Sequence, residues 1–246
     1  MRQEYPSKVL VAGASGRTGR EILRELNERS VSVRAMTRSA DNRESLVAHG
    51  ADEVVVGDLL NPEDARRAIE GCDAVLFAAG SSLTTGLTRP SRVVDGDGVL
   101  NLIEAAVDEG VRTFVLQSSI GVGDSRQGMP FWARLIVLRW AVREKDKAEQ
   151  ALLESGLDYV IIRPGWMNDD PATGDVLVAE GSKTMTGSIP RADVARLMVA
   201  SLFAPDVVNR TFEVVARTDA KAVASPALVD SSWAQQNSPV ETSSEA

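Results

Sequence analysis

The chain of 246 residues has only one cysteine, Cys72, and only one histidine, His49. These counts exclude disulfide bonds within the chain and zinc sites that combine several cysteine and histidine ligands, and no metal site is predicted. Cys72 is expected to fill a small buried gap, because an unpaired cysteine behaves as a small apolar side chain. His49 is expected in the turn His49-Gly50, since glycine commonly follows the last turn of a helix.

Long basic runs and long apolar runs are also missing. Asp and Glu number 35 against 27 Lys and Arg, and the resulting net charge of -8 argues against nucleic acid as a partner. No segment approaches the roughly 20 apolar residues that a membrane helix needs. The first residues, MRQEYPSK, lack the apolar core of a signal peptide. These absences predict a cytoplasmic protein that binds neither nucleic acid nor membranes.

What the sequence does contain is a repeated alternation of short apolar runs with helix-like segments. Continuous apolar runs are typical of strands that are buried on both faces of a parallel sheet. Their alternation with helices predicts an α/β fold, in which a doubly wound parallel sheet carries helices on both faces. The predicted strands are Val9–Ala12, Val31–Met36, Glu53–Val56, Ala74–Ala79, Thr113–Gln117, Tyr159–Ile162 and Thr211–Val215.

Residues 1–218 are predicted to form a single domain, because a chain with 43% hydrophobic residues can bury one full core. Residues 219–246 are rich in Ala, Ser and Pro and lack a sustained apolar period. We expect this segment to be a flexible tail, since it buries too little apolar surface to offset the entropy cost of ordering. Docking of Trp233 on the domain or on a neighbouring chain is the alternative.

Three glycines, Gly13, Gly16 and Gly19, follow the first strand directly and precede a helix-like segment. This order suits a dinucleotide pyrophosphate: the first glycine turns the chain, the second lets the backbone approach the phosphates, and the third lets the helix pack on the sheet. The N-terminus of the helix then directs its free N–H groups at the phosphates. The predicted cofactor-binding residues of this loop are Gly13, Ser15, Gly16, Arg17, Thr18 and Gly19.

The second predicted strand leads into Thr37-Arg38, where an NAD-binding protein usually has an acidic residue. Arg38 has the opposite charge and can pair with the 2′-phosphate of NADP, and Arg17 is expected to reach the same group. NADP(H) is therefore the preferred cofactor, with NAD as the alternative. Both arginines could instead be solvated surface residues.

Further cofactor contacts are expected where other strands end, because ligands of doubly wound folds bind at the carboxyl edge of the sheet. Asp58 can accept a hydrogen bond from the adenine amino group, while Leu59 packs on the ring, although Asp58 could instead cap the following helix. The small residues Ala78, Ala79 and Gly80 allow the backbone to pass close to the nicotinamide ribose. Ser118, after the fifth strand, is assigned to the same site.

Taken together, the segments GASGRTG, GDLLNPE, FAAG, VLQSSIGVGD, KAEQALLESGLDYVIIRPG and SIPRADVA, with Arg38, resemble the atypical short-chain dehydrogenase/reductase proteins. This NAD(P)-binding group includes NmrA-like sensors and the flavin and biliverdin-IXβ reductases. The resemblance runs from about residue 8 to about residue 216. The stretch KDKAEQALLESGLDYVIIRPG is especially similar to the dehydrogenase-like domains of chloroplast translocon-associated proteins. The resemblance implies a Rossmann-like fold, NADPH as the cofactor, and a substrate wall that begins at Pro164-Gly165.

The wider superfamily uses a serine, a tyrosine and a lysine, with the tyrosine as the proton donor. The resemblance assigns Ser119 to the serine position and Lys145 to the lysine position, with Lys147 as the less favoured register. Ser119 could instead satisfy only its own loop, and Lys145 could be a solvated helix lysine.

The tyrosine position is occupied by Ala141, or by Arg143 in the alternative register. The only tyrosines of the chain, Tyr5 and Tyr159, lie outside this helix. Ordinary carbonyl chemistry with a tyrosine donor is therefore not expected.

The leading hypothesis is an NADPH-dependent oxidoreductase of a small or planar acceptor, such as a flavin, a quinone or a carbonyl compound. Residues 81–94, 121–140 and 164–190 are expected to build the substrate side. A non-catalytic NADP(H)-binding redox sensor or scaffold is the alternative, and an enzyme of the nucleotide-sugar epimerase or dehydratase type is the third. The protein is expected to be a monomer, or a homodimer through the helix at 131–155.

Overall fold

The computed structural model describes residues 5–29, 31–80, 94–123, 125, 139–182, 185–221 and 228–235. Its centre is an eight-stranded sheet in the order β3-β2-β1-β4-β5-β6-β10-β8, in which only β8 runs antiparallel to its neighbour. All seven predicted strands are present, so the predicted doubly wound α/β fold is confirmed. The strands of this sheet are β1 (Lys8–Ala12), β2 (Ser32–Thr37), β3 (Glu53–Val56), β4 (Ala74–Phe77), β5 (Thr113–Gln117), β6 (Asp158–Pro164), β8 (Val176–Ala179) and β10 (Arg210–Ala216).

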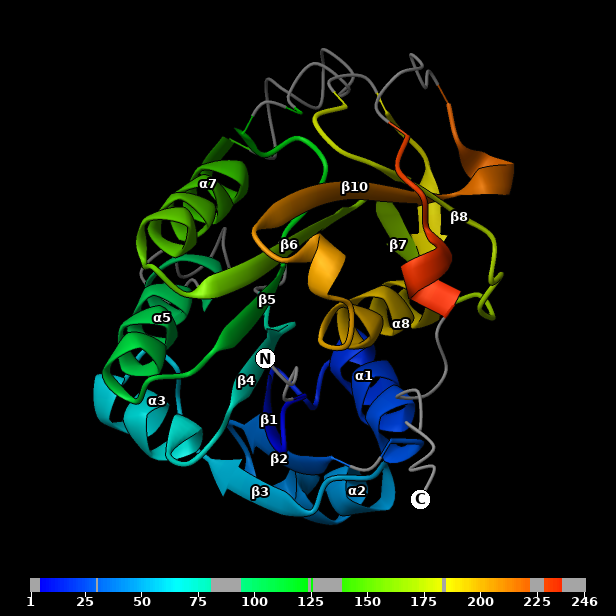
Figure 1. Ribbon diagram of the computed structural model, residues 1–246. Helices are drawn as coiled ribbons and strands as arrows, with labels where there is room; N and C mark the ends of the chain where they lie inside the picture. Colours follow the sequence, from blue (N-terminus) through cyan, green and yellow to red (C-terminus); the bar gives the residue numbers. More distant parts are fainter. Residues whose placement is uncertain are drawn as a thin grey trace, which may run out of the picture.

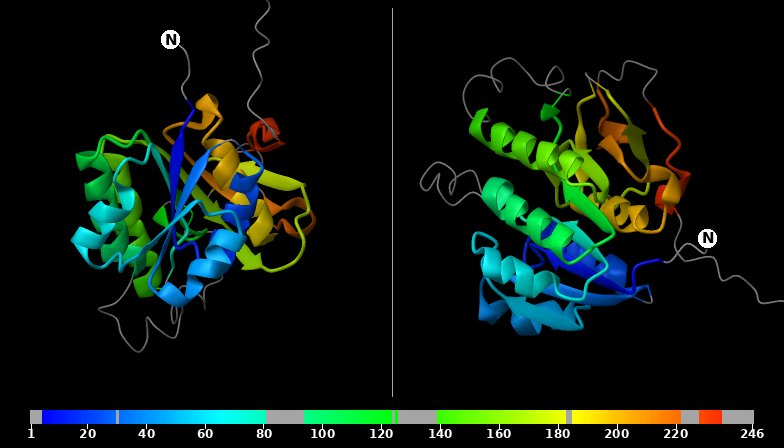
Figure 2. Two further views of the ribbon diagram at one scale, coloured as in Figure 1. Left: turned by 90° about the horizontal axis from the view of Figure 1, so that it is seen from below. Right: turned by 60° about the vertical axis from the view of Figure 1, so that its left-hand side comes forward.

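Two layers of helices cover the two faces of the sheet (Figures 1 and 2). Buried residues of α1, α2 and α8 form one apolar core with one face of the sheet, and buried residues of α3, α5 and α7 form a second core with the other face. Because both faces are covered, the central strands must be apolar on both sides, as Val9, Leu10 and Val11 are. The helices are α1 (Arg17–Asn27), α2 (Arg43–Ala48), α3 (Pro62–Ile69), α5 (Val99–Asp108), α7 (Arg139–Glu154) and α8 (Arg191–Ser201).

The strand order reverses direction at β1, which pairs with β2 on one side and with β4 on the other. In a doubly wound sheet, such a reversal leaves a crevice at the carboxyl ends of the two central strands, because the connections on either side turn away from each other. The loops after β1 and β4 border this crevice. The topology therefore places the ligand site where the three glycines lie.

Three short strands were not predicted from the sequence. β8 adds to the edge of the main sheet, while β7 (Trp166–Asn168) and β9 (Ser188–Pro190) form a separate two-stranded sheet. With three or four residues each, these strands are too short to show a periodic pattern. β7 and β9 lie in the segment 164–190 that the sequence assigns to the substrate side.

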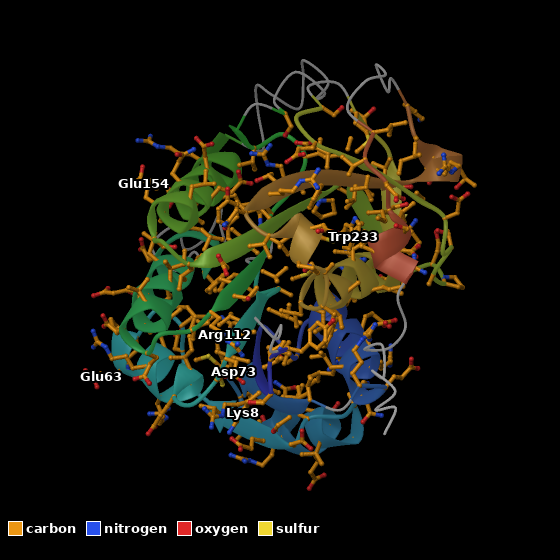
Figure 3. The ribbon with its side chains drawn as sticks, viewed as in Figure 1. Lys8, Glu63, Asp73, Arg112, Glu154 and Trp233 are labelled. Carbon is orange, nitrogen blue, oxygen red and sulfur yellow. The ribbon has the colours of Figure 1, made fainter. Side chains whose placement is uncertain are left out.

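The segment after residue 219 differs from the expected solvated tail in its described part. Trp233 is only 8% exposed and belongs to the core beneath α8, where its ring centroid lies 5.7 Å from that of Phe212 (Figure 3). Leu228 forms a bridge with Ala179 of β8. Docking of a large indole buries enough apolar surface to hold a short segment whose neighbours are small and polar.

The local predictions about His49 and Cys72 are confirmed, since His49 ends α2 and Cys72 is buried. Asn61 caps α3 by accepting a hydrogen bond from the Glu63 N–H at 3.2 Å. Asp193 lies in the first turn of α8. It is fully buried and accepts hydrogen bonds from the N–H and hydroxyl groups of Thr173, both at 2.8 Å. No helix in the described part of the chain is long and apolar enough to cross a membrane.

Asp73 joins the beginnings of two neighbouring strands (Figure 3). Its Oδ2 accepts hydrogen bonds from the N–H groups of Ser7 and Lys8, at 2.7 and 2.9 Å, and from the Ser7 hydroxyl. Partial burial alone would raise the pKa of Asp73, but these hydrogen bonds and Arg112 outweigh it and lower the pKa. The carboxylate therefore stabilises the fold above its unfolded pKa, and this contribution is lost as the pH falls through the folded pKa.

Asp73→Asn is expected to lower the free energy of unfolding by about 1–2 kcal/mol at pH 7, because the acceptor charge is removed. The difference from the wild type should shrink below about pH 4, where the wild-type carboxylate also becomes protonated. Urea unfolding of both proteins at pH 7 and pH 3 measures this. An equal difference at the two pH values would contradict the assigned role of the charge.

Candidate cofactor and active site

An open cleft lies at the carboxyl edge of the sheet, across the point where the strand order reverses. It is formed by the ends of β1, β2, β3 and β4 with the loops that follow them, and by Val94 at the start of the helical turn Val94–Gly98 that leads into α5. Eight residues predicted from the sequence to bind the cofactor line it together. The lining residues are Gly13, Ser15, Gly16, Met36, Thr37, Arg38, Gly57, Leu59, Ala78, Ala79, Gly80 and Val94.

The glycine loop has the close backbone contacts that its proposed role requires. Gly13 has a φ of +84°, and a Cβ at this residue would lie 2.5 Å from the backbone of Ala79. Gly19 packs so closely that a Cβ would lie 2.3 Å from the Gly13 carbonyl oxygen. Gly16 caps α1 without a side chain, so the first N–H groups of this helix stay accessible to a phosphate. The loop thus fits a dinucleotide pyrophosphate.

Arg38 is the first residue after β2. It lines one end of the cleft, and its side chain is exposed. It forms no ion pair with any residue that the structure describes. The preceding residue, Thr37, is buried, and its hydroxyl accepts a hydrogen bond from Asn42 Nδ2 at 3.0 Å. This contact anchors the turn that carries Arg38. A guanidinium on an anchored turn, without a carboxylate partner in the described chain, is suited to bind a phosphate.

Arg17 lies outside this cleft and has a different partner. Its Nη1 forms an ion pair with Asp169 Oδ2 at 2.6 Å, and Arg191 Nη1 contacts the other oxygen of Asp169 at 2.6 Å. Desolvation would raise the pKa of Asp169, but the hydrogen bond from Arg17 and the two guanidinium charges lower it. Arg17 therefore connects the glycine loop with the residues after β7. Its predicted contact with the 2′-phosphate stays a prediction, as does a cofactor contact by the buried Thr18.

The loop after β3 presents Leu59 to the cleft, but not Asp58. Asp58 Oδ1 accepts a hydrogen bond from the Leu60 N–H at 3.1 Å, and the Asp58 N–H donates to Asp64 at 2.8 Å. These contacts fix the loop and hold Leu59 in place. The alternative for Asp58 was to cap the following helix, but the N-cap of α3 is Asn61. The contact of Asp58 with adenine stays a prediction.

Ser118 and Lys145 lie together beside a second, small cavity between β5 and α7. The Ser118 hydroxyl is buried and has no hydrogen-bond partner in the described chain. Lys147 is more exposed and forms an ion pair with Glu144 at 2.8 Å, so it does not reach this cavity. The structure thus favours Lys145 over Lys147 for the lysine position. Ser119 follows in the same loop but does not line either cavity.

A buried ion pair network fixes α7, the helix that carries Lys145. Arg163 on β6 contacts both oxygens of Glu149 on α7, at 3.1 and 2.7 Å, and one oxygen of Glu213 on β10, at 3.0 Å. All three residues are less than 10% exposed. Glu149 lies one helical turn from Lys145. By fixing the position of α7, the network therefore also fixes the position of Lys145 at the small cavity.

Neither tyrosine of the chain reaches the carboxyl edge. Tyr159 lies near the beginning of β6, at the opposite edge of the sheet, where its N–H donates to Asn209 at 3.1 Å. The Tyr5 ring lies 5.4 Å from the ring of Phe203. Neither tyrosine is therefore placed to act as the proton donor that the wider superfamily uses.

Sequence reasoning missed several residues of the site. Met36, Thr37 and Gly57 line the cleft, and Gln117 borders the small cavity, while Val94, assigned to the substrate segment 81–94, lines the cofactor cleft. The first three follow directly from the ends of predicted strands, so their position was a usable signal. Of the predicted substrate segments, 81–93 and most of 121–140 lie outside the described residues. Trp166 in the third segment is 78% exposed.

Comparison with known proteins agrees with this geometry. A family model described as NAD(P)H-binding matches residues 13–205. A Bacillus subtilis protein named as an uncharacterized sugar epimerase, YhfK, is 34% identical over 84% of this chain and 92% of its own. Sanguinarine reductase from Eschscholzia californica is 31% identical over 83% of this chain and 87% of its own. The chloroplast protein TIC 62 of Arabidopsis thaliana is 31% identical over 86% of this chain, but over only 36% of its own length.

Among solved structures, the anaerobillin reductase ChuY from Escherichia coli O157:H7 superimposes with a TM-score of 0.75 at 27% identity. The match covers 85% of this chain and 97% of ChuY. Together with the family match over most of the chain, this likeness confirms the recognised resemblance and the Rossmann-like fold. The chain belongs to the NAD(P)H-binding family.

Proposed function

We propose that the protein is an NADPH-dependent oxidoreductase that reduces a small, planar acceptor. The observation that carries the proposal is the continuity of the site. The cleft that runs from Arg38 along the glycine loop to Gly80 fits a dinucleotide, and the cavity with Ser118 and Lys145 lies at the end of the neighbouring strand. Similarity to sanguinarine reductase and to the anaerobillin reductase ChuY supports a reductase.

Each part of the site has a distinct task in this proposal. Arg38 holds the 2′-phosphate, and the N-terminus of α1 holds the pyrophosphate. Lys145 holds the nicotinamide ribose by donating hydrogen bonds, and Ser118 offers its unpaired hydroxyl to the same half of the cofactor. Bound NADPH supplies a hydride, that is, two electrons and one proton. The second proton comes from water, because no tyrosine stands at the site.

A planar acceptor fits the residues beside β7. Trp166 offers a large exposed aromatic face directly after Pro164-Gly165. Aromatic rings stack on flat conjugated molecules such as flavins and quinones. Covering the exposed indole in this way would remove apolar surface from water, which is favourable. Ser119 remains a proposed contact to the oxygen of the acceptor. We also propose that the protein works as a cytoplasmic monomer or homodimer.

Oxidation of NADPH, followed at its 340 nm absorbance with a panel of flavins, quinones and aldehydes, tests the proposal. We expect oxidation with at least one planar acceptor, and a lower kcat for Lys145→Met than for the control variant Lys147→Met. Lys147 is the matched control because it lies on the same helix and pairs with Glu144 outside the cavity. Binding of NADPH without turnover across the panel would contradict the reductase.

One observation favours a second function, an NADP(H)-binding redox sensor or scaffold. The tyrosine position holds Ala141 or Arg143, so the site lacks the superfamily's usual acid while it keeps the cofactor cleft. A sensor needs no acid, but its partner must bind the NADP+ and NADPH forms with different affinities. Equal partner affinity with NADP+ and with NADPH would exclude this function.

Arg38→Asp is expected to weaken NADPH binding by about 10- to 100-fold, with little change for NADH, because only NADPH carries the 2′-phosphate. Fluorescence titration with the two nucleotides measures the ratio of their affinities. Arg66→Asp is the matched control: it makes the same change in charge on the exposed surface of α3, where Arg66 pairs with Glu63. An unchanged ratio in Arg38→Asp would refute the assignment.

A further inference from the structure

Gln117 is the last residue of β5 and lies at the carboxyl edge of the sheet. Leu116 is the register partner of Phe77, so Gln117 stands beside Ala78, which lines the cofactor cleft. The Gln117 Nε2 lies 3.6 Å from the sulfur of Met167, and the amide therefore sits between β5 and β7. A thioether sulfur is a weak acceptor, so this contact satisfies little of the amide's hydrogen-bonding capacity.

The oxygen of this amide, Gln117 Oε1, is buried and has no hydrogen-bond partner among the residues that the structure describes. The hydroxyl of the next residue, Ser118, also lacks a partner in the described part of the chain, and Gln117, Ser118 and Lys145 line the same small cavity. Buried polar atoms are nearly always paired, because an unpaired one loses its hydration without compensation. Two such atoms on successive residues beside a cofactor cleft indicate a bound ligand that forms hydrogen bonds with them.

The surroundings of Gln117 define the chemistry of that ligand. Met167 and Ala78 are apolar, so the group that forms a hydrogen bond with the Gln117 amide is expected to be neutral itself. An amide binds best to another neutral group that has both an N–H donor and a carbonyl acceptor. The nicotinamide ring carries such a group, its primary carboxamide. The phosphates and the adenine are placed at the other end of the cleft by the glycine loop and Arg38.

We propose that Gln117 is a binding residue for the nicotinamide half of the cofactor, and that its Oε1 accepts a hydrogen bond from the carboxamide NH2 group. This inference rests on the NADP(H)-binding part of the proposed function and does not require turnover. Together with Ser118, which lines the same small cavity, Gln117 would hold the ring at one edge and restrict its rotation. A ring held in this way presents the same face to each acceptor.

The test compares three nucleotides in binding to the wild type and to Gln117→Leu. NADP+ carries the carboxamide, its 3-acetylpyridine analogue has a methyl group in place of the NH2 group, and adenosine 2′,5′-bisphosphate lacks the nicotinamide half. Calorimetric titration gives the three dissociation constants. Leucine keeps a similar volume at this half-buried position, and Thr113→Val at the other end of β5 is the control for a disturbed strand.

The wild type should bind NADP+ about tenfold more tightly than the acetylpyridine analogue, and Gln117→Leu should bind the two alike. Affinity for adenosine 2′,5′-bisphosphate should be unchanged in Gln117→Leu, and Thr113→Val should keep the wild-type preference. Without nucleotide, Gln117→Leu should melt about 2–4 °C higher, because the unpaired oxygen is gone.

A preference for NADP+ over the analogue that survives in Gln117→Leu would overturn the inference. An equal loss of affinity for all three nucleotides would also overturn it, since the residue would then act only on the structure of the strand. These outcomes differ from failure of the reductase proposal, in which NADPH binds normally but no acceptor is reduced.

Discussion

Arg163→Met is expected to lower the free energy of unfolding by about 3–5 kcal/mol. Arg163 is the only guanidinium with a described contact to both Glu149 and Glu213, and all three side chains are almost fully buried. Its removal leaves two buried carboxylates without this counter-charge, so a large part of the cost of their desolvation is no longer offset, although Glu213 keeps its hydrogen bond from the Ser182 N–H. Urea unfolding at pH 7 measures the loss.

A triple variant tests the physical cause of that loss. Arg163→Met combined with Glu149→Leu and Glu213→Leu removes the charges together, and it should recover most of the lost stability, since buried ion pairs are often replaced by apolar residues at little cost. The single variant should also lower kcat more than the triple variant if a displaced α7 misplaces Lys145. A single variant as stable as the wild type would show that the network does not hold α7.

Gly13→Ala is expected to weaken NADPH binding by about 100-fold or more. The added Cβ would lie 2.5 Å from the backbone of Ala79, and this contact lies inside the cleft, so the loops after β1 and β4 must separate. The positive φ of Gly13 adds backbone strain. NADPH fluorescence titration gives the affinity, and thermal unfolding gives the accompanying loss of stability.

Gly110→Ala is a control that separates the steric effect of the added Cβ from the effect of backbone strain. Gly110 also has a positive φ, of +69°, but nothing lies within 4 Å of its Cβ position. It follows α5, away from the cleft. We expect this control to lose about 1 kcal/mol of stability through backbone strain alone and to bind NADPH normally. Comparable NADPH affinities in Gly13→Ala and Gly110→Ala would contradict the role of the glycine loop as the phosphate cradle.

The sequence predicted the parts of the fold and site that depend on local pattern. Strands buried on both faces leave continuous apolar runs, so β1 to β6 and β10 could be located. The carboxyl edge of a doubly wound sheet is fixed by topology. For this reason eight cleft residues could be predicted from the glycine loop after β1 and from the ends of β2, β3 and β4. Asn61 could be recognised as a cap because its partner is two residues away.

The remaining features depend on contacts between residues that are distant in sequence. Arg17 pairs with Asp169, 152 residues further along the chain, and no local pattern predicts this partner. The local pattern around Gln117 is that of an ordinary strand residue, and only the folded chain brings Met167, 50 residues away, next to its amide. Arg163 lies in an apolar strand, where a charged side chain needs a buried partner. Its partners, Glu149 on α7 and Glu213 on β10, are distant in sequence, so no local pattern predicts them.

The most direct test of the central claim is a fluorescence titration of the purified protein with NADPH and NADH, followed by addition of FMN and a quinone in the same cuvette. We predict saturable binding of NADPH, at least about tenfold tighter than that of NADH, and loss of the NADPH signal when the acceptor is added. Absence of binding by either nucleotide would contradict the assignment of the cleft to a dinucleotide, and with it the proposed function.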